Sequence, residues 1–85
     1  MASVVRLSEL DERVTKDVIV AFCSSFGDIK TVDVSMDNLR NVNKGHAYVE
    51  FFEAQDAADC VDNLDLADLY GKTVRVAIAA DRQTA

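Results

Sequence analysis

The stretch KGHAYVEF, residues 44–51, carries side chains suited to binding chemistry in this 85-residue chain. His46, Tyr48 and Glu50 alternate there with small or apolar residues. Alternation with a period of two is typical of a β-strand that has one buried and one exposed face. The exposed face would carry two rings and a carboxylate. Rings on a wet sheet can stack on unpaired bases, whereas a single exposed aromatic residue is also common on strands without such a role.

Cations are expected close to these rings. Guanidinium groups stack on bases, and scattered cations pair with phosphates, so rings and cations on one open face suit single-stranded nucleic acid. The alternation places some of these cations on the same face and others at its rim. The residues predicted to bind nucleic acid are Arg6, Arg40, Lys44, His46, Tyr48 and Arg75.

The net charge of −6 does not exclude a nucleic-acid ligand, because the acidity is local. Seven of the fifteen acidic residues lie between Lys44 and Lys72, where there is no Lys or Arg, so the rest of the chain has a charge of +1. Most of this block falls on a predicted helix and the connector after it. That helix is expected to lie behind the sheet, away from the rings.

The pattern of metal-ligating and nucleophilic residues predicts neither a metal site nor an enzyme. Cys23 and Cys60 are 37 residues apart without a CxxC motif, so we expect two buried thiols. A calcium-loop pattern from Asp33 fails because Asn38 and Lys44 replace its glycine and its closing glutamate. One histidine and no glycine-rich phosphate loop leave no nucleophile–base pair. No cofactor is expected.

Hydrophobic periodicity predicts six elements in the order strand, helix, strand, strand, helix, strand. The first helix is expected to begin after Thr15 as its N-cap and to end at Gly27, and the second to span 54–64. The predicted strands are 4–8, 29–36, 44–52 and 73–79. This order favours an α+β, ferredoxin-like βαββαβ sandwich, with a four-stranded antiparallel sheet and two helices on one face.

The alternation also predicts which strand residues enter the core. Met36 in the second strand and Ile78 in the last are expected to point inward with the valines of those strands. The sheet face opposite the helices is left open to water. Residues 3–80 are predicted to form one domain and 81–85 a tail or the start of a linker. Without a membrane-length apolar run or a leader-like N-terminus, we expect an intracellular monomer that does not enter membranes.

The motif KGHAYVEF resembles the octamer of the RNA-recognition motif (RRM) family, basic–Gly–aromatic–Gly/Ala–aromatic–aliphatic–any–aromatic. Only His46 departs from it. VRLSEL, residues 5–10, is similar to the family's hexamer, with Arg6 where typical members have an aromatic residue. The resemblance implies a stacking platform at Arg6, His46 and Tyr48, of which only Tyr48 keeps a phenyl-type ring. It therefore implies weak binding of single-stranded RNA with low sequence selectivity.

The segment DAADCVDNLDLADLYGKTVRV resembles most closely the N-terminal RRM of nuclear cyclophilin-type peptidyl-prolyl isomerases. This resemblance implies a nuclear protein of pre-mRNA processing, with an isomerase domain elsewhere and a splicing or chromatin factor as a protein partner. An alternative is a protein-interaction RRM that has largely lost RNA binding. It would use its helical or its sheet face for a partner. On the helical side that partner would be a basic peptide or an arginine-rich splicing factor, and the alternative there is a helix face that is simply solvated. The acidic residues of that face are Glu53, Asp56, Asp59 and Asp62.

Overall fold

Short helices and strands follow one another between residues 3 and 79, the part of the chain that the computed structural model describes. The predicted tail at 81–85, and Ala80 before it, lie outside the described residues. The elements are β1 (Val4–Ser8), α1 (Lys16–Cys23), the 3₁₀ helix η1 (Ser24–Phe26), β2 (Ile29–Asp37), β3 (Val42–Phe51), α2 (Ala54–Leu64), β4 (Asp68–Leu69), β5 (Lys72–Thr73) and β6 (Arg75–Ala79).

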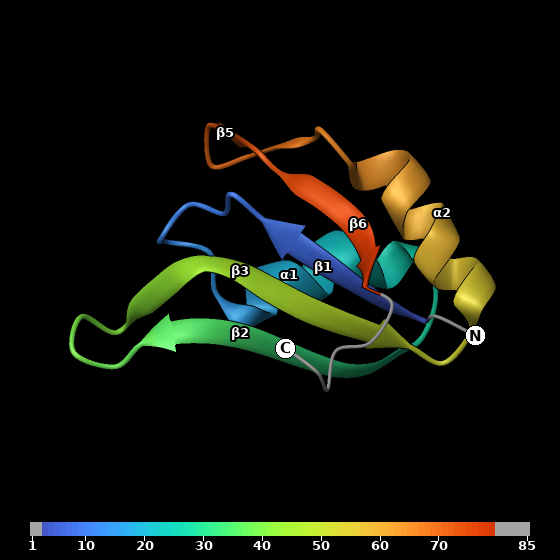
Figure 1. The fold of residues 1–85 in the computed structure, drawn as a ribbon, viewed down its shortest axis with the longest axis horizontal. Helices are drawn as coiled ribbons and strands as arrows, with labels where there is room; N and C mark the ends of the chain where they lie inside the picture. The colour runs from blue at the N-terminus through green and yellow to red at the C-terminus, as the bar shows by residue number, and fades with distance from the viewer. Residues whose placement is uncertain (1–2, 80–85) are drawn as a thin grey trace.

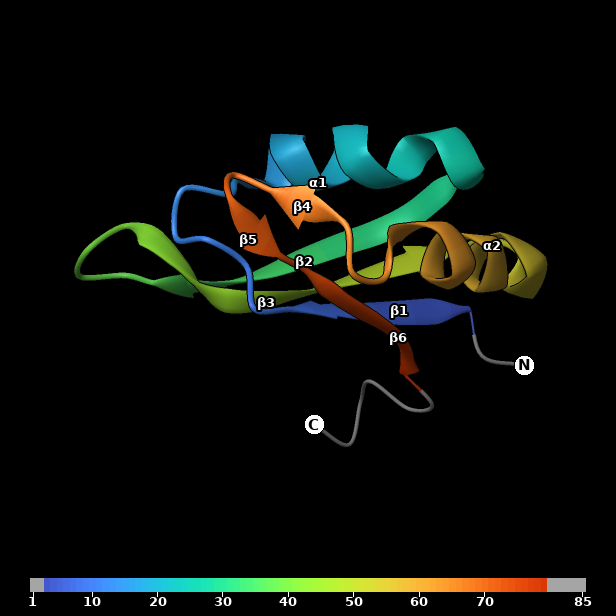
Figure 2. The same cartoon turned by 90° about the horizontal axis from the view of Figure 1, so that it is seen from above.

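Four strands form one antiparallel sheet in the order β2-β3-β1-β6 (Figure 1). Both α-helices lie on the same side of this sheet, as Figure 2 shows, so neither helix covers the other face. The predicted ferredoxin-like sandwich is confirmed. Its two central strands are β3 and β1, which carry the two stretches that resemble the RRM motifs.

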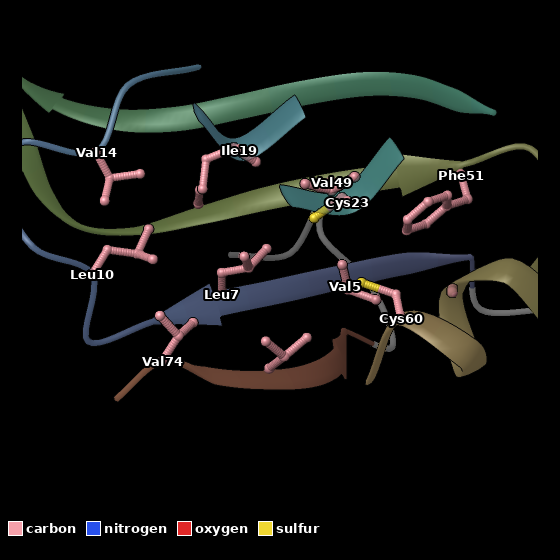
Figure 3. Packing of buried hydrophobic residues seen from close by; sticks show 13 residues of the cluster. Val5, Leu7, Leu10, Val14, Ile19, Cys23, Val49, Phe51, Cys60 and Val74 are labelled. Atoms are coloured by element: carbon pink, nitrogen blue, oxygen red, sulfur yellow. The ribbon is translucent and has the colours of Figure 1, made fainter. Parts of the chain in front are cut away.

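The core lies between the sheet and the helices (Figure 3). Val5, Leu7, Val49 and Phe51 enter it from the two central strands and are at most 1 % exposed. From the helices come Ile19 and Cys23 of α1 and Ala57 and Cys60 of α2, all fully buried. Burial of these apolar groups is the main force that holds the layers together, and it fixes which residues of β1 and β3 face water.

The first helix begins where predicted, but α1 ends at Cys23 and the 3₁₀ helix η1 continues to Phe26, so Gly27 follows η1 rather than α1. The Thr15 hydroxyl accepts a hydrogen bond from the Val18 N–H at 3.3 Å, as an N-cap does. After η1, Gly27 adopts an extended conformation rather than a left-handed one. A Cβ atom at Gly27 would lie 2.1 Å from Oδ2 of Asp56. Glycine is therefore required by the close approach of α2.

Two residues expected in the core are partly exposed. Met36 is 37 % exposed, because β2 and β3 extend beyond the helices (Figure 2) and their register shifts between Val34 and Met36. Ile78 is 41 % exposed, because β6 is an edge strand with β1 as its one neighbour in the sheet. The connection between the strands predicted at 29–36 and 44–52 is also shorter, since β2 ends at Asp37 and β3 begins at Val42.

The predicted last strand is divided, and its first part belongs to a small hairpin of β4 and β5. Tyr70 and Gly71 form the two-residue connection with φ of 53° and 79°, as a type I′ turn requires. Arg13 fastens this hairpin to the segment between β1 and α1. Its Nη2 donates to the Tyr70 carbonyl at 3.2 Å, and its guanidinium carbon lies 5.2 Å from the centroid of the Tyr70 ring.

Candidate nucleic-acid interface

A row of side chains crosses the open face through Tyr48. In the strand register Tyr48 pairs with Arg6 of β1 on one side and with Asp33 of β2 on the other. Arg6 in turn pairs with Ala77 of β6. Side chains in such directly opposed pairs have Cβ atoms about 4.5–5.5 Å apart. Tyr48 therefore lies near the centre of the open face, between a guanidinium and a carboxylate.

His46 belongs to the neighbouring row. It pairs with Ser8 of β1, two residues along the strand from the pair of Arg6 and Tyr48. His46 and Tyr48 are both partly buried, whereas Arg6 is exposed. The structure thus brings Arg6, His46 and Tyr48 together on adjacent strands. Chemically, this cluster offers a phenol ring, an imidazole and a guanidinium plane, each of which can stack on a base.

Glu50 does not bind the cations of this cluster. Its carboxylate accepts a hydrogen bond from the Thr31 hydroxyl at 3.3 Å and lies 3.9 Å from Nζ of Lys30. Both partners belong to β2. Within residues 3–79 Arg6 makes no salt bridge. The guanidinium of Arg6 is thus not held by any carboxylate of the described residues.

Arg75 is tied to the outer edge of the sheet. Its Nε lies 3.0 Å from Oδ1 of Asp65, the residue after α2, and the same oxygen accepts the N–H of Val76 at 2.9 Å. These hydrogen bonds, first from Val76 and then from Arg75, lower the pKa of Asp65. The pair is half exposed, and such surface pairs are weak. Arg75 therefore remains within reach of a ligand at the edge but does not belong to the central cluster.

Arg40 and Lys44 lie at one end of the sheet. Arg40 belongs to the turn between β2 and β3, and its Nη2 is 2.9 Å from Oε1 of Glu12. Lys44 is exposed near the beginning of β3. The six residues predicted to bind RNA thus occupy three places: the centre of the open face, its outer edge and one end.

A groove at that end includes a cation that the sequence interpretation missed. The groove has a volume of about 980 Å³ and lies among the end of β1, the turn between β2 and β3, and the hairpin. Its basic lining residues are Arg6, Arg40, Lys44, His46 and Lys72, and its acidic ones are Glu9, Asp11, Glu12 and Asp37. Lys72 was missed because 73–79 was interpreted as one strand. The two-residue Tyr70–Gly71 signal for a hairpin could have revealed it.

Cys23 and Cys60 meet in the core although they are far apart in sequence. Both are free and fully buried (Figure 3), which confirms the expectation of buried thiols. The hydrogen bond that the Cys23 thiol donates to the Cys60 sulfur, together with burial, raises the pKa of Cys23. A raised pKa makes a thiol a poor nucleophile and a poor metal ligand. Among residues 3–79, no group of three or more His, Cys, Asp or Glu side chains could hold a metal ion.

The acidic residues of α2 lie in the layer behind the open face (Figure 2). Glu53 and Asp62 are exposed, whereas Asp56 and Asp59 are partly buried. Asp56 packs against Gly27, and Asp59 accepts a hydrogen bond from the Gln55 side chain at 3.0 Å. No helix within the described range is long and apolar enough to cross a membrane.

Comparison with known proteins gives one family match and similar curated relatives. Residues 5–75 match the model of the RNA recognition motif. The chain is 37 % identical over 78 residues to RNA-binding protein with serine-rich domain 1 of Danio rerio, which covers 89 % of this chain and 28 % of the relative. It is 31 % identical over 70 residues to spliceosome-associated protein 49 of Schizosaccharomyces pombe, covering 82 % of this chain and 21 % of that protein. The chain thus spans under a third of the length of either relative.

Solved structures share the fold at low sequence identity. The structure of the Rna15 RRM with bound GU RNA superposes with a TM-score of 0.89 at 23 % identity and covers 95 % of this chain and 86 % of that one. The crystal structure of RNA-binding protein PG1 has a TM-score of 0.87 at 20 % identity, with 95 % and 98 % of the two chains covered. At these identities the similarity establishes the arrangement of strands and helices, which agrees with the sandwich described above.

Proposed function

Since this chain belongs to the RNA recognition motif family, an RNA-binding fold without enzymatic activity, we propose that its open sheet face binds single-stranded RNA weakly and with low sequence selectivity. The position of Tyr48 carries this proposal. Its ring lies at the centre of a face that no helix covers, with Arg6 directly opposite on β1. A base stacked on Tyr48 would have the Arg6 guanidinium beside it, and His46 lies one row away for a neighbouring base.

The weakness of the proposed binding follows from the residues that replace rings. A base stacked on an aromatic side chain contributes about 1–3 kcal/mol, and here Arg6 and His46 stand at two of the three stacking positions. Weakening two stacks costs about one to two decades of affinity, which gives a Kd of ~10 µM or poorer. About two or three phosphate contacts would give a shallow salt slope of about −1.5 to −2.

A pair of variants at Tyr48 tests the proposal. Tyr48→Ala removes the central ring and should abolish measurable binding of a labelled trinucleotide, whereas Tyr48→Phe keeps the ring and should retain most of the affinity. Fluorescence anisotropy measures binding, and circular dichroism checks the fold. Tyr70→Ala is the matched control, because Tyr70 lies on the hairpin over Arg13. Equal RNA affinity in Tyr48→Ala and the wild type would exclude the platform.

We propose the nucleus and pre-mRNA processing as the cellular setting. The names of the two curated relatives support this setting, since one is an RNA-binding protein and the other is associated with the spliceosome. An isomerase domain in the same protein, as in nuclear cyclophilins, rests on the motif of residues 56–76 alone, and neither relative is named as an isomerase. Mass and isomerase activity of the endogenous protein would test this assignment. We expect the domain to act as a monomer.

A protein partner on α2 is the second candidate function. The exposed carboxylates of Glu53 and Asp62 favour it, because the segment between Lys44 and Lys72 contains no base to offset them. The partner would be a basic segment of a splicing or chromatin factor. Titration with an arginine-rich peptide tests this second function. If the partner binds at α2, the double variant Glu53→Lys with Asp62→Lys should lose peptide binding.

A further inference from the structure

The two cysteines of the chain lie together in the core, and each comes from a different helix. Cys23 is the last residue of α1, and Cys60 lies in the middle of α2. Both side chains are fully buried, and Figure 3 shows them among the apolar residues of the core. The Cys23 thiol donates a hydrogen bond to the Cys60 sulfur. A covalent bond between the two sulfurs would therefore join α1 to α2.

A second contact shows how closely these segments approach. A Cβ atom at Gly27 would lie 2.1 Å from Oδ2 of Asp56. Gly27 is four positions after Cys23 along the chain, and Asp56 is four positions before Cys60. The absence of a side chain at Gly27 thus lets α2 approach the segment that follows α1. A disulfide needs Cβ atoms about 3.5–4.5 Å apart, and this close packing favours such a separation.

The two thiols are not chemically equivalent. The hydrogen bond from Cys23 stabilises the thiolate of Cys60 and lowers its pKa, although burial opposes this change. The same hydrogen bond and burial raise the pKa of Cys23, and the negative charge of an ionised Cys60 adds to this effect. The thiolate is the form of cysteine that peroxides oxidise. Cys60 is thus the sulfur that would react first, with Cys23 beside it.

Local opening of α2 would give an oxidant access to Cys60. The Glu53 side chain makes no capping hydrogen bond at the start of this helix, whereas Thr15 caps α1. The last turn of α2 contains Asp62 and no basic residue, and a negative charge there opposes the helix dipole. Both features weaken the ends of α2. Elements can open locally at a lower free energy than the whole fold, so a small oxidant can reach Cys60 without global unfolding.

We propose that Cys23 and Cys60 form a reversible redox modification site, in which hydrogen peroxide converts the two thiols to a disulfide that links α1 to α2. The Cys60 thiolate attacks one peroxide oxygen, the O–O bond breaks, and the departing hydroxide takes up the proton that Cys60 released. Cys60 is then a sulfenic acid. The Cys23 sulfur attacks the Cys60 sulfur, the S–O bond breaks, and the hydroxyl leaves with the Cys23 proton as water. The two sulfur atoms are oxidised and the peroxide is reduced to water.

This modification site is independent of RNA binding. The pair lies behind the sheet and uses no residue of the open face, so the site stands whether or not that face binds RNA. The disulfide would close a loop that contains β2 and β3, and a cross-link across such a loop stabilises a fold mainly by restricting the unfolded chain. Reducing conditions restore the thiols, which makes the disulfide a transient response to peroxide.

Tryptic mapping of the peroxide-treated, folded chain tests the proposal after free thiols have been blocked. Trypsin cleaves after Lys and Arg, so it should release Cys23 in the peptide 17–30 and Cys60 in the peptide 45–72. We expect these two peptides to be joined with the loss of two hydrogen atoms, and dithiothreitol should separate them. The Tm of the oxidised chain should rise by at least about 5 °C. Dithiothreitol should reverse this rise, whereas it does not reduce oxidised methionine.

Single substitutions assign the order of the two steps. In Cys23→Ala, oxidation should stop at the Cys60 sulfenic acid, which dimedone traps. In Cys60→Ala, Cys23 should not react with dimedone at the same peroxide dose. The double variant Cys23→Ala with Cys60→Ala is the control, and peroxide should not raise its Tm. Circular dichroism of the reduced variants checks their fold.

Two results would overturn the proposal. One is blocked, unlinked thiols in both peptides after peroxide treatment of the folded wild type, with linkage only when urea is present. The other is a disulfide that joins two chains instead of Cys23 to Cys60 of the same chain. Both results come from the wild type, so they decide the question even where a variant does not fold.

Discussion

Arg6 and Tyr48 lie directly opposite each other on the two central strands, on the face of the sheet that the helices leave open. The pair places a planar cation next to an aromatic ring, so that one ligand can contact both. In the motif that the chain resembles, both positions carry aromatic residues, so the arginine changes the chemistry but keeps a flat group. We therefore expect RNA recognition at this pair to depend on the plane of the guanidinium as well as on its charge.

Substitution of Arg6 separates these two contributions. Arg6→Lys keeps the charge and removes the planar group, so we expect trinucleotide affinity to fall two- to fivefold, about 0.5–1 kcal/mol, with an unchanged salt slope. Arg6→Gln should lose at least as much affinity. Anisotropy titrations at two salt concentrations measure both quantities. Wild-type affinity in Arg6→Lys would mean that Arg6 contributes only charge.

Gly27→Ala should destabilise the fold through Asp56. The added Cβ would lie 2.1 Å from Oδ2 and 2.3 Å from Cγ of Asp56, so one side chain must move. We expect a loss of about 1–3 kcal/mol in the free energy of unfolding, measured by urea denaturation. In a double-mutant cycle with Asp56→Ala, the double variant should lose less than the sum of the single changes. Additive losses would show that the contact is not the cause.

Acid should weaken the fold in a defined range of pH. Hydrogen bonds from Arg13 lower the pKa of Asp11 to about 2, and those from Val76 and Arg75 lower the pKa of Asp65. Because both pKa values are lower in the folded chain, the ionised carboxylates stabilise the fold above about pH 4. This contribution is lost as the pH falls through the folded values.

Thermal unfolding at about pH 5 and about pH 2 measures this loss. The fall in Tm should be smaller in the double variant Asp11→Asn with Asp65→Asn than in the wild type. Asp62→Asn is the control, since the Asp62 side chain accepts no hydrogen bond within residues 3–79. If the Tm of the double variant falls by as much as the Tm of the wild type, other carboxylates govern acid unfolding.

Charge reversal on α2 tests the assignment of the two faces. Glu53→Lys with Asp62→Lys adds positive charge to the helical layer, away from the open face. RNA affinity should stay equal or rise slightly, because long-range attraction for phosphates increases. Fluorescence anisotropy with the same trinucleotide measures the RNA affinity of the double variant. A clear loss of RNA binding would place the RNA site on the helices instead.

The fold could be predicted from the sequence because its signals agree. The apolar stripe that includes Ile19 and Cys23 gives the first helix one apolar face, and the alternation around Val49 gives its strand another. Six elements that each have one apolar face can bury all of these faces in a single core when both helices pack on one side of the sheet. The partial exposure of Met36 and Ile78 was not predicted, because alternation indicates which face of the sheet a side chain lies on but not where the covering helices end. The resemblance to a known motif added the positions of the platform.

The site was only partly predictable because the contacts of long, flexible side chains do not follow from the strand alternation. Alternation placed Arg6 and Tyr48 on the open face, and the register pairs them. It could not show that Arg75 reaches back to Asp65 or that Arg40 binds Glu12. These contacts join segments far apart in sequence through flexible side chains. The groove depends on three such segments, which is why Lys72 was missed.

Backbone NMR during titration with a short unstructured RNA tests the central claim most directly. Binding on the open face predicts chemical-shift changes centred on Arg6, His46 and Tyr48, with no comparable changes along α2. The same titration of Tyr48→Ala should lose these changes. Unchanged spectra at millimolar RNA, or changes confined to α2, would contradict the assignment of the open sheet face as the RNA-binding surface.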